Sequence, residues 1–344
     1  MELTVEKKAF HSIDLCKLLM SFCVVATHTN PLYNCKNIIA LNLYNSLVTM
    51  AVPFFFLASG FFLGQKMEYP FCFENSINKI KQYLLKITKL YLIWNIVYLP
   101  LAIYEYIQDK TSVFRSFLIY LRGLFFIGEH YNSWILWYLL STIYTLIIIL
   151  ILMKLKVKPK RMIMVGIALY IFGMGISYLL NYEGQMSGIS LIIQKLFRYS
   201  IGSGRIFSGF LYIPIGMILS KRKISKKIAW IMLLGGLFLN ICIKNESITS
   251  ILLAISTIGL FIVVEDIRLR NSKVFSFLRK MSTVIYFIHL YVWTCYYCVI
   301  YKEKTYGMDS FFVTLIISIL IAILYILIKN EIKFIKKSKK CVIK

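Results

Sequence analysis

The first apolar stretch of the chain reads Ser12-Ile-Asp14-Leu-Cys-Lys17-Leu-Leu-Met-Ser-Phe-Cys-Val-Val-Ala-Thr-His28-Thr-Asn-Pro31. It is long and apolar enough for a membrane-spanning helix, yet it carries three ionisable side chains. Such groups are costly within a membrane and usually face a bundle interior or a wet cavity. Eleven helical steps of about 100° and 1.5 Å put Lys17 and His28 on one stripe with Asp14, about 16 Å apart. They either hold the two ends of a long ligand, or Lys17 snorkels and His28 sits at the opposite surface.

Composition sets the class of protein. Hydrophobic residues make up 59% of the chain and charged residues 16%, whereas a soluble domain carries about 25% charged residues. The net charge of +25 would suggest nucleic-acid binding in a soluble chain. Here the basic residues lie in short links between apolar runs, where they set topology and touch anionic headgroups. The sequence predicts a polytopic protein of the lipid bilayer that does not bind nucleic acid.

The pattern of apolar runs predicts an all-α membrane protein of about ten transmembrane helices, forming one domain over residues 1–344. Most runs have about the 20 residues that a spanning helix needs, although the sixth and seventh are shorter. The runs are 12–30, 44–65, 84–104, 134–153, 162–180, 205–220, 228–243, 247–264, 282–301 and 310–328.

The charge of the links predicts that both termini face the cytoplasm. With that orientation the inner links hold 27 Lys and Arg residues and the outer links hold 9, as the positive-inside rule requires. Residues 112–128 and 189–201 are amphipathic. If either crossed the membrane alone, later basic links would fall outside, so we expect interfacial or re-entrant segments on the outer side.

Three further residues are candidates on the inner half of the protein. Ser59 precedes Gly60 in an aromatic run, where small residues open room for a ligand or for close helix packing. Lys86 and Lys89 open the third run. With Lys17 they would form a cationic cluster suited to phosphates, unless each one only snorkels to the surface.

Four candidates remain outside these groups. Glu129 lies at the end of an outer link, where it could assist an acceptor or be a solvated loop residue. Arg205 opens the sixth run and could bind an anionic or sugar-bearing group, or snorkel. Tyr286 and His289 lie on one face of the ninth run, with Trp293. A hydrogen-bonded structural histidine is the alternative for His289.

These pieces together resemble the acyltransferase 3 family of polytopic membrane acyltransferases. The family has a basic residue, ten intervening residues and a His in its first helix, and further elements follow in a fixed order along nearly the whole chain. The matching residues are Lys17 and His28, Phe55-Phe56-Leu57-Ala58-Ser59-Gly60-Phe61, Lys86 and Lys89, Trp137-Tyr138-Leu139, and Ser282 with Tyr286 and His289. Arg is more usual than Lys in the third-helix pair.

The resemblance implies a cytoplasmic acyl-CoA donor and an extracytoplasmic acceptor, often a glycan hydroxyl. It implies that His28 is the catalytic base or acyl carrier, and that Lys17, Lys86 and Lys89, with Ser59, bind the donor. Supporting or acceptor-side roles then fall to Asp14, Arg205, Glu129, Tyr286 and His289. We expect O-acetyl transfer from acetyl-CoA to a cell-surface glycan or wall precursor, without a metal, in the plasma membrane of a bacterium.

A second resemblance concerns the Pro53-Phe-Phe-Phe56 run and the Arg-containing sixth run. Both look like the membrane portion of membrane-bound serine racemases, a portion associated with supplying serine. Transport of a small polar solute such as serine is therefore the alternative function.

Overall fold

A computed structural model describes residues 10–184, 187–243 and 245–342, without the side chains of 246 and 333–342. Every regular element in these ranges is a helix, which confirms the all-α prediction. Part of the predicted cytoplasmic charge, in residues 1–9 and 343–344, lies outside the described residues. The chain divides into two compact units, residues 1–51 with 260–344, and residues 52–259.

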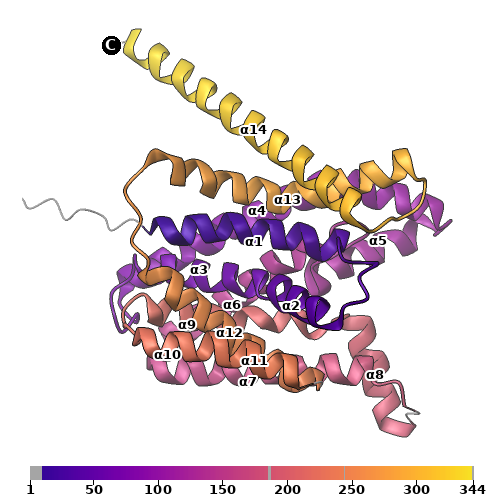
Figure 1. Cartoon of the computed structure of the whole chain (residues 1–344), viewed down its shortest axis with the longest axis horizontal. Coiled ribbons are helices and arrows are strands. Elements are labelled where there is room, and N and C mark those ends of the chain that lie inside the picture. The colour runs from indigo at the N-terminus through magenta and orange to yellow at the C-terminus, as the bar shows by residue number, and fades with distance from the viewer. Residues whose placement is uncertain (1–9, 185–186, 244, 343–344) are drawn as a thin grey trace, which may run out of the picture. The chain divides into compact units, whose positions relative to one another are not determined.

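Figure 1 labels the helices of the two units, whose bounds follow. The first unit holds α1 (His11–Thr29), α2 (Ile38–Thr49), α13 (Lys273–Ile300) and α14 (Met308–Val342). The second unit holds α3 (Ala51–Gly64), α4 (Glu74–Gln108), α5 (Val113–Arg122), α6 (Trp137–Lys154), α7 (Pro159–Asn181), α8 (Gly188–Ser200), α9 (Ser208–Leu219), α10 (Lys226–Trp230), α11 (Gly236–Cys242) and most of α12 (Glu246–Asp266).

In the first unit α1 packs along α13, and the two helices run parallel (Figure 1). His11 at the start of α1 hydrogen-bonds Asn271, just before α13. At the other end the Gly307 N–H, just before α14, donates to the Thr29 carbonyl. Helix α14 then turns back along both helices, and one apolar cluster joins all three, with Leu18, Val25, Met281, Ile285, Ala322 and Ile326 at its centre.

Eight of the ten predicted runs lie in helices that are long and apolar enough to cross a membrane. The run 205–220 instead forms the short α9, which is bent by 72° against α8. The run 228–243 forms α10 and α11 with a π-helical stretch, Ile231–Gly235, between them. The predicted amphipathic segments 112–128 and 189–201 contain α5 and α8, of 10 and 13 residues, which are too short to span the bilayer as single α-helices.

The parallel pair α1 and α13 bears on the number of crossings. Parallel neighbours require an even number of membrane crossings from the start of one helix to the start of the other. The six long helical spans between α1 and α13, counting α1 itself, satisfy this condition. If the bent pair α8 and α9 also formed one span, the number of candidate spans in the described residues would rise from eight to nine.

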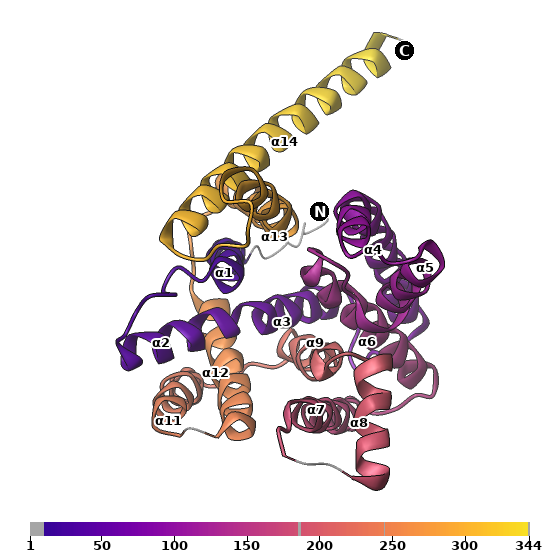
Figure 2. The same ribbon diagram turned by 90° about the vertical axis from the view of Figure 1, so that its right-hand side faces the viewer.

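The second unit is held together by close helix contacts at glycines. A Cβ atom at Gly60 of α3 would overlap the backbone carbonyl of Ile213 in α9, and one at Gly216 would overlap that of Leu57. Helix α9 also lies beside α7 (Figures 1 and 2), where Gly166 meets the Phe210 carbonyl. Small residues let helix backbones approach closely in membranes, and they do so on two sides of α9.

Candidate functional site

Helix α1 presents Asp14, Lys17 and His28 from one continuous helix, as the sequence predicts. Asp14 is only 4% exposed, and its carboxylate lies 3.5 Å from the guanidinium of Arg279 on α13. Lys17 and His28 are half-buried. Asp14 thus anchors α1 to α13.

From the sequence alone, Arg279 counted only among the basic residues of a link. Its position three residues before Ser282 nevertheless placed it one turn from a predicted motif.

The late motif of the sequence, on α13, lies directly against α1. The Ser282 hydroxyl donates a hydrogen bond of 2.9 Å to the Lys17 carbonyl oxygen. Further along the pair, the imidazole rings of His28 and His289 have centroids 5.4 Å apart and are tilted by 33°. The Tyr286 ring contacts that of His289 at 6.4 Å. Four candidates far apart in the sequence therefore meet along one helix pair.

The tautomer of His289 follows from its hydrogen bonds. Its Nδ1 atom lies 2.8 Å from the Tyr286 carbonyl oxygen and 3.1 Å from that of Ile285. A carbonyl oxygen can only accept, so Nδ1 carries the proton, and in the neutral ring Nε2 holds a lone pair. The residue is fully buried, and Nε2 has no hydrogen-bond partner among the described residues.

In the second unit Ser59 meets another motif of the sequence. Its hydroxyl oxygen lies 3.0 Å from the Tyr138 hydroxyl oxygen, and the Tyr138 ring packs 4.6 Å from that of Phe56. This places the Phe-Phe-x-x-Ser-Gly element of α3 beside the Trp-Tyr-Leu element that opens α6. The alternative prediction for Ser59 is a role in helix packing. Close packing is seen at its neighbour Gly60, which contacts the backbone of α9.

Lys86 and Lys89 lie on the exposed surface of α4, one turn apart on the same side of the helix. They belong to the second unit, whereas Lys17 belongs to the first. The predicted cluster of all three lysines therefore stays a prediction.

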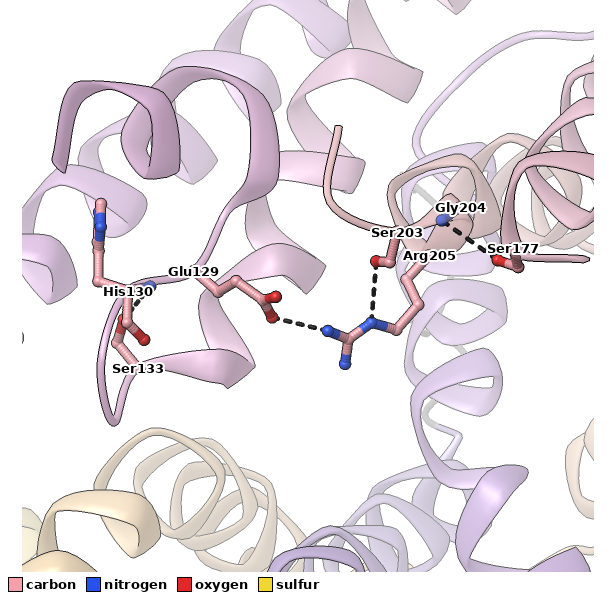
Figure 3. Close-up of polar contacts among 7 residues, drawn as sticks. All are labelled: Glu129, His130, Ser133, Ser177, Ser203, Gly204 and Arg205. Carbon is pink, nitrogen blue, oxygen red and sulfur yellow. Dashed lines mark hydrogen bonds and ion pairs between the residues drawn. The ribbon is translucent and has the colours of Figure 1, made fainter. Parts of the chain in front are cut away.

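Glu129 and Arg205 form an ion pair of 2.8 Å, shown in Figure 3. The Arg205 Nε–H also donates to the Ser203 hydroxyl at 3.2 Å, and the guanidinium lies 5.6 Å from the centre of the Trp137 ring. Burial raises the pKa of Glu129, and the Arg205 charge opposes that shift. The side chains are 21% and 47% exposed, so the two predicted acceptor-side residues are paired with each other at a partly open position.

His130 points away from that ion pair (Figure 3). Its ring stacks on Tyr120 with a centroid distance of 4.1 Å and an angle of 8°. Both ring nitrogens are buried without a hydrogen-bond partner among the described residues. Burial, with the Arg122 charge nearby, lowers the pKa of His130 to about 4. The ring is therefore neutral near pH 7, and it fills the space above Gly123.

Comparisons with known proteins add two kinds of match. The model of the acyltransferase 3 family, described as “Acyltransferase domain”, matches residues 10–328. One curated relative, named amino-acid racemase, from Enterococcus faecalis, is 25% identical over 234 residues, 67% of this chain and 32% of the relative. A second amino-acid racemase of that organism is 26% identical over 149 residues, 40% of this chain and 20% of the relative. The chain thus spans about a third of the first relative's length. No solved structure matches the chain.

Proposed function

Since the chain belongs to the acyltransferase 3 family, it is a membrane acyltransferase, and we propose that its donor is acetyl-CoA on the cytoplasmic side. The acceptor is a hydroxyl of an extracytoplasmic glycan or wall precursor, in the plasma membrane of a bacterium. The observation that carries this proposal is α1, which bears Lys17 and His28 on one stripe about 16 Å apart. A donor bound at one depth can thus present its thioester to an imidazole at another.

His28 is the catalytic base in this proposal. It takes the proton of the acceptor hydroxyl as the oxygen attacks the acetyl carbonyl carbon. The new C–O bond forms while the C–S bond of the thioester breaks. His28 then gives the proton to the leaving thiolate. An acetyl group held transiently on the His28 ring would give the same products in two steps.

We assign donor binding to three lysines and one serine. Lys17, Lys86 and Lys89 bind the phosphates of coenzyme A as point charges, and Ser59 lines the donor path. Asp14 holds α1 in register on α13 through Arg279. Glu129 and Arg205 shape the acceptor side, where their ion pair is partly open.

The relatives named amino-acid racemase favour a second candidate function. Those proteins are much longer than the matched segment, and the matched segment is rich in membrane helices. A membrane portion of such a protein could carry an amino acid. Transport of a small polar solute such as serine is therefore the alternative for this chain.

Two assays on purified protein separate the candidates. Acyl transfer predicts that the protein in detergent releases free coenzyme A from acetyl-CoA, with water as a slow acceptor and faster release when a glycan acceptor is added. It also predicts that reconstituted vesicles take up labelled serine no faster than empty vesicles. Serine uptake without any turnover of acetyl-CoA would reverse the assignment.

A further inference from the structure

His289 is a buried histidine that, within the described part of the chain, uses only one of its two ring nitrogens in hydrogen bonds. Its Nδ1–H is bonded to two carbonyls of its own helix, while Nε2 is fully buried and has no partner among the described residues. A buried acceptor left without a hydrogen bond destabilises the folded protein. An apolar side chain of similar size would avoid that cost, so a structural role alone does not account for an imidazole here.

The ring of His28 is a neighbouring imidazole on α1. Two imidazoles joined by an N–H···N hydrogen bond have ring centres about 5 Å apart, given a normal bond of about 2.9 Å. The observed separation is 5.4 Å with a tilt of 33°. That separation is within reach of an N–H···N bond between the two rings, formed by rotation of the half-buried His28 ring. His289 is fixed by its two carbonyl partners and would not need to move.

One polar side chain of α14 lies at the same level. Ile285 and Ala322 share an apolar cluster, and α13 and α14 are antiparallel. His289 lies about one turn after Ile285 on α13, and Ser318 lies about one turn before Ala322 on α14. Because the two helices are antiparallel, His289 and Ser318 lie at about the same level. The Ser318 hydroxyl is buried and without a partner among the described residues. Ser318 competes with His28 as the hydrogen-bond partner of Nε2 of His289. An experiment must therefore distinguish the effect of losing Ser318 from the effect of losing His28.

We propose that His289 is a positioning residue that relays a proton to and from His28 during acyl transfer. The proposal rests on the proposed function, in which His28 takes the acceptor proton. As one His28 nitrogen receives that proton, the other passes its own to Nε2 of His289, and the movement reverses when the thiolate leaves. No net proton is gained or lost, and the bonds made and broken are the C–O and C–S bonds already described.

The test is steady-state turnover of acetyl-CoA by full-length protein in detergent. His289→Asn places an amide N–H where Nδ1–H lies, so it keeps a donor to the helix carbonyls while removing Nε2. We expect kcat to fall about 10- to 100-fold, with KM for acetyl-CoA within about twofold. The loss is smaller than the roughly 10²- to 10⁴-fold that a general base itself contributes, because His289 acts only through His28. Ser318→Ala is the matched control and should leave kcat within about twofold of the wild type.

A double variant separates a relay from a general loss of structure. The double variant His28→Ala with His289→Asn should have the same residual kcat as His28→Ala alone, because the relay acts only through His28. Should His289→Asn fail to fold, His289→Gln tests the same point, since its amide cannot carry the proton onward. Unchanged kcat in the folded variant, additive losses in the double variant, or an equal loss in Ser318→Ala would each overturn the relay. Absence of turnover in the wild type would overturn the proposed function as well.

Discussion

The Ser282 hydroxyl donates a hydrogen bond of 2.9 Å to the Lys17 carbonyl oxygen, joining residues 265 positions apart in the chain. This bond fixes the register between α1 and α13. Together with the Asp14–Arg279 ion pair on one side, it sets which residues face each other further along the helices. The meeting of His28 and His289 is a consequence of that register.

Replacing Ser282 by Ala should weaken this register. Ser282 is fully buried, so losing one hydrogen bond should lower the free energy of unfolding by about 1 kcal/mol. Denaturant titration in mixed micelles measures the change. Thr283→Ala is the control, because the exposed Thr283 hydroxyl bonds only to a carbonyl of its own helix. Equal losses in the two variants would contradict the assigned role of Ser282.

The Asp14–Arg279 pair predicts an asymmetric response to mutation. Arg279→Gln removes the positive charge beside the buried Asp14 carboxylate and should lower the free energy of unfolding by about 1–2 kcal/mol. This is below the roughly 3–5 kcal/mol expected for a fully buried pair, because Arg279 is half-exposed. Asp14→Asn in the same chain should recover part of that loss. Lys280→Gln removes a neighbouring charge and should have little effect. A double variant less stable than Arg279→Gln would argue against the pairing.

The contact between α3 and α9 predicts different results for two glycines. A Cβ at Gly60 would overlap backbone of Ile213, whereas one at Gly175 meets nothing within 4 Å. Gly60→Ala should therefore lose about 1–3 kcal/mol through overpacking. Gly175→Ala should be neutral, or gain up to about 1 kcal/mol from helix propensity. Thermal unfolding of the two purified variants compares them, and wild-type stability in Gly60→Ala would contradict the close packing.

His130 predicts a pH dependence of stability. Its pKa is lowered to about 4 in the folded protein from an ordinary value of 6.5. Between these values the unfolded chain binds more protons, so stability rises as pH rises through this window and is lost as pH falls toward 4. The effect is on the order of 3 kcal/mol.

His130→Phe keeps the ring stacked on Tyr120 and removes the titration. The difference in unfolding free energy between wild type and variant, followed from pH 7 down to 4 in one detergent, should move in favour of the variant as the pH falls. A difference that stays constant over this range would show that His130 is not held neutral by burial.

The sequence alone identified the helices whose apolar runs are long, but not how the shorter runs fold. The expected span 205–220 begins with a 3₁₀ turn after Gly202, which has a positive φ, and α9 is bent against α8. The charged stripe of α1 could be derived from helical periodicity. Its partners could not, because Arg279, Ser282 and His289 reach α1 only through tertiary packing. Glu129 and Arg205 were predicted singly, and only the structure pairs them.

We propose above all that this chain uses His28 to transfer an acyl group from acetyl-CoA. The most direct measurement is acetyl-CoA binding and turnover by the purified protein, comparing wild type with His28→Ala and Lys17→Ala. We predict that the wild type binds and turns over, that His28→Ala binds without comparable turnover, and that Lys17→Ala loses affinity. Binding and turnover absent from all three proteins would contradict the claim, and so would full turnover by His28→Ala.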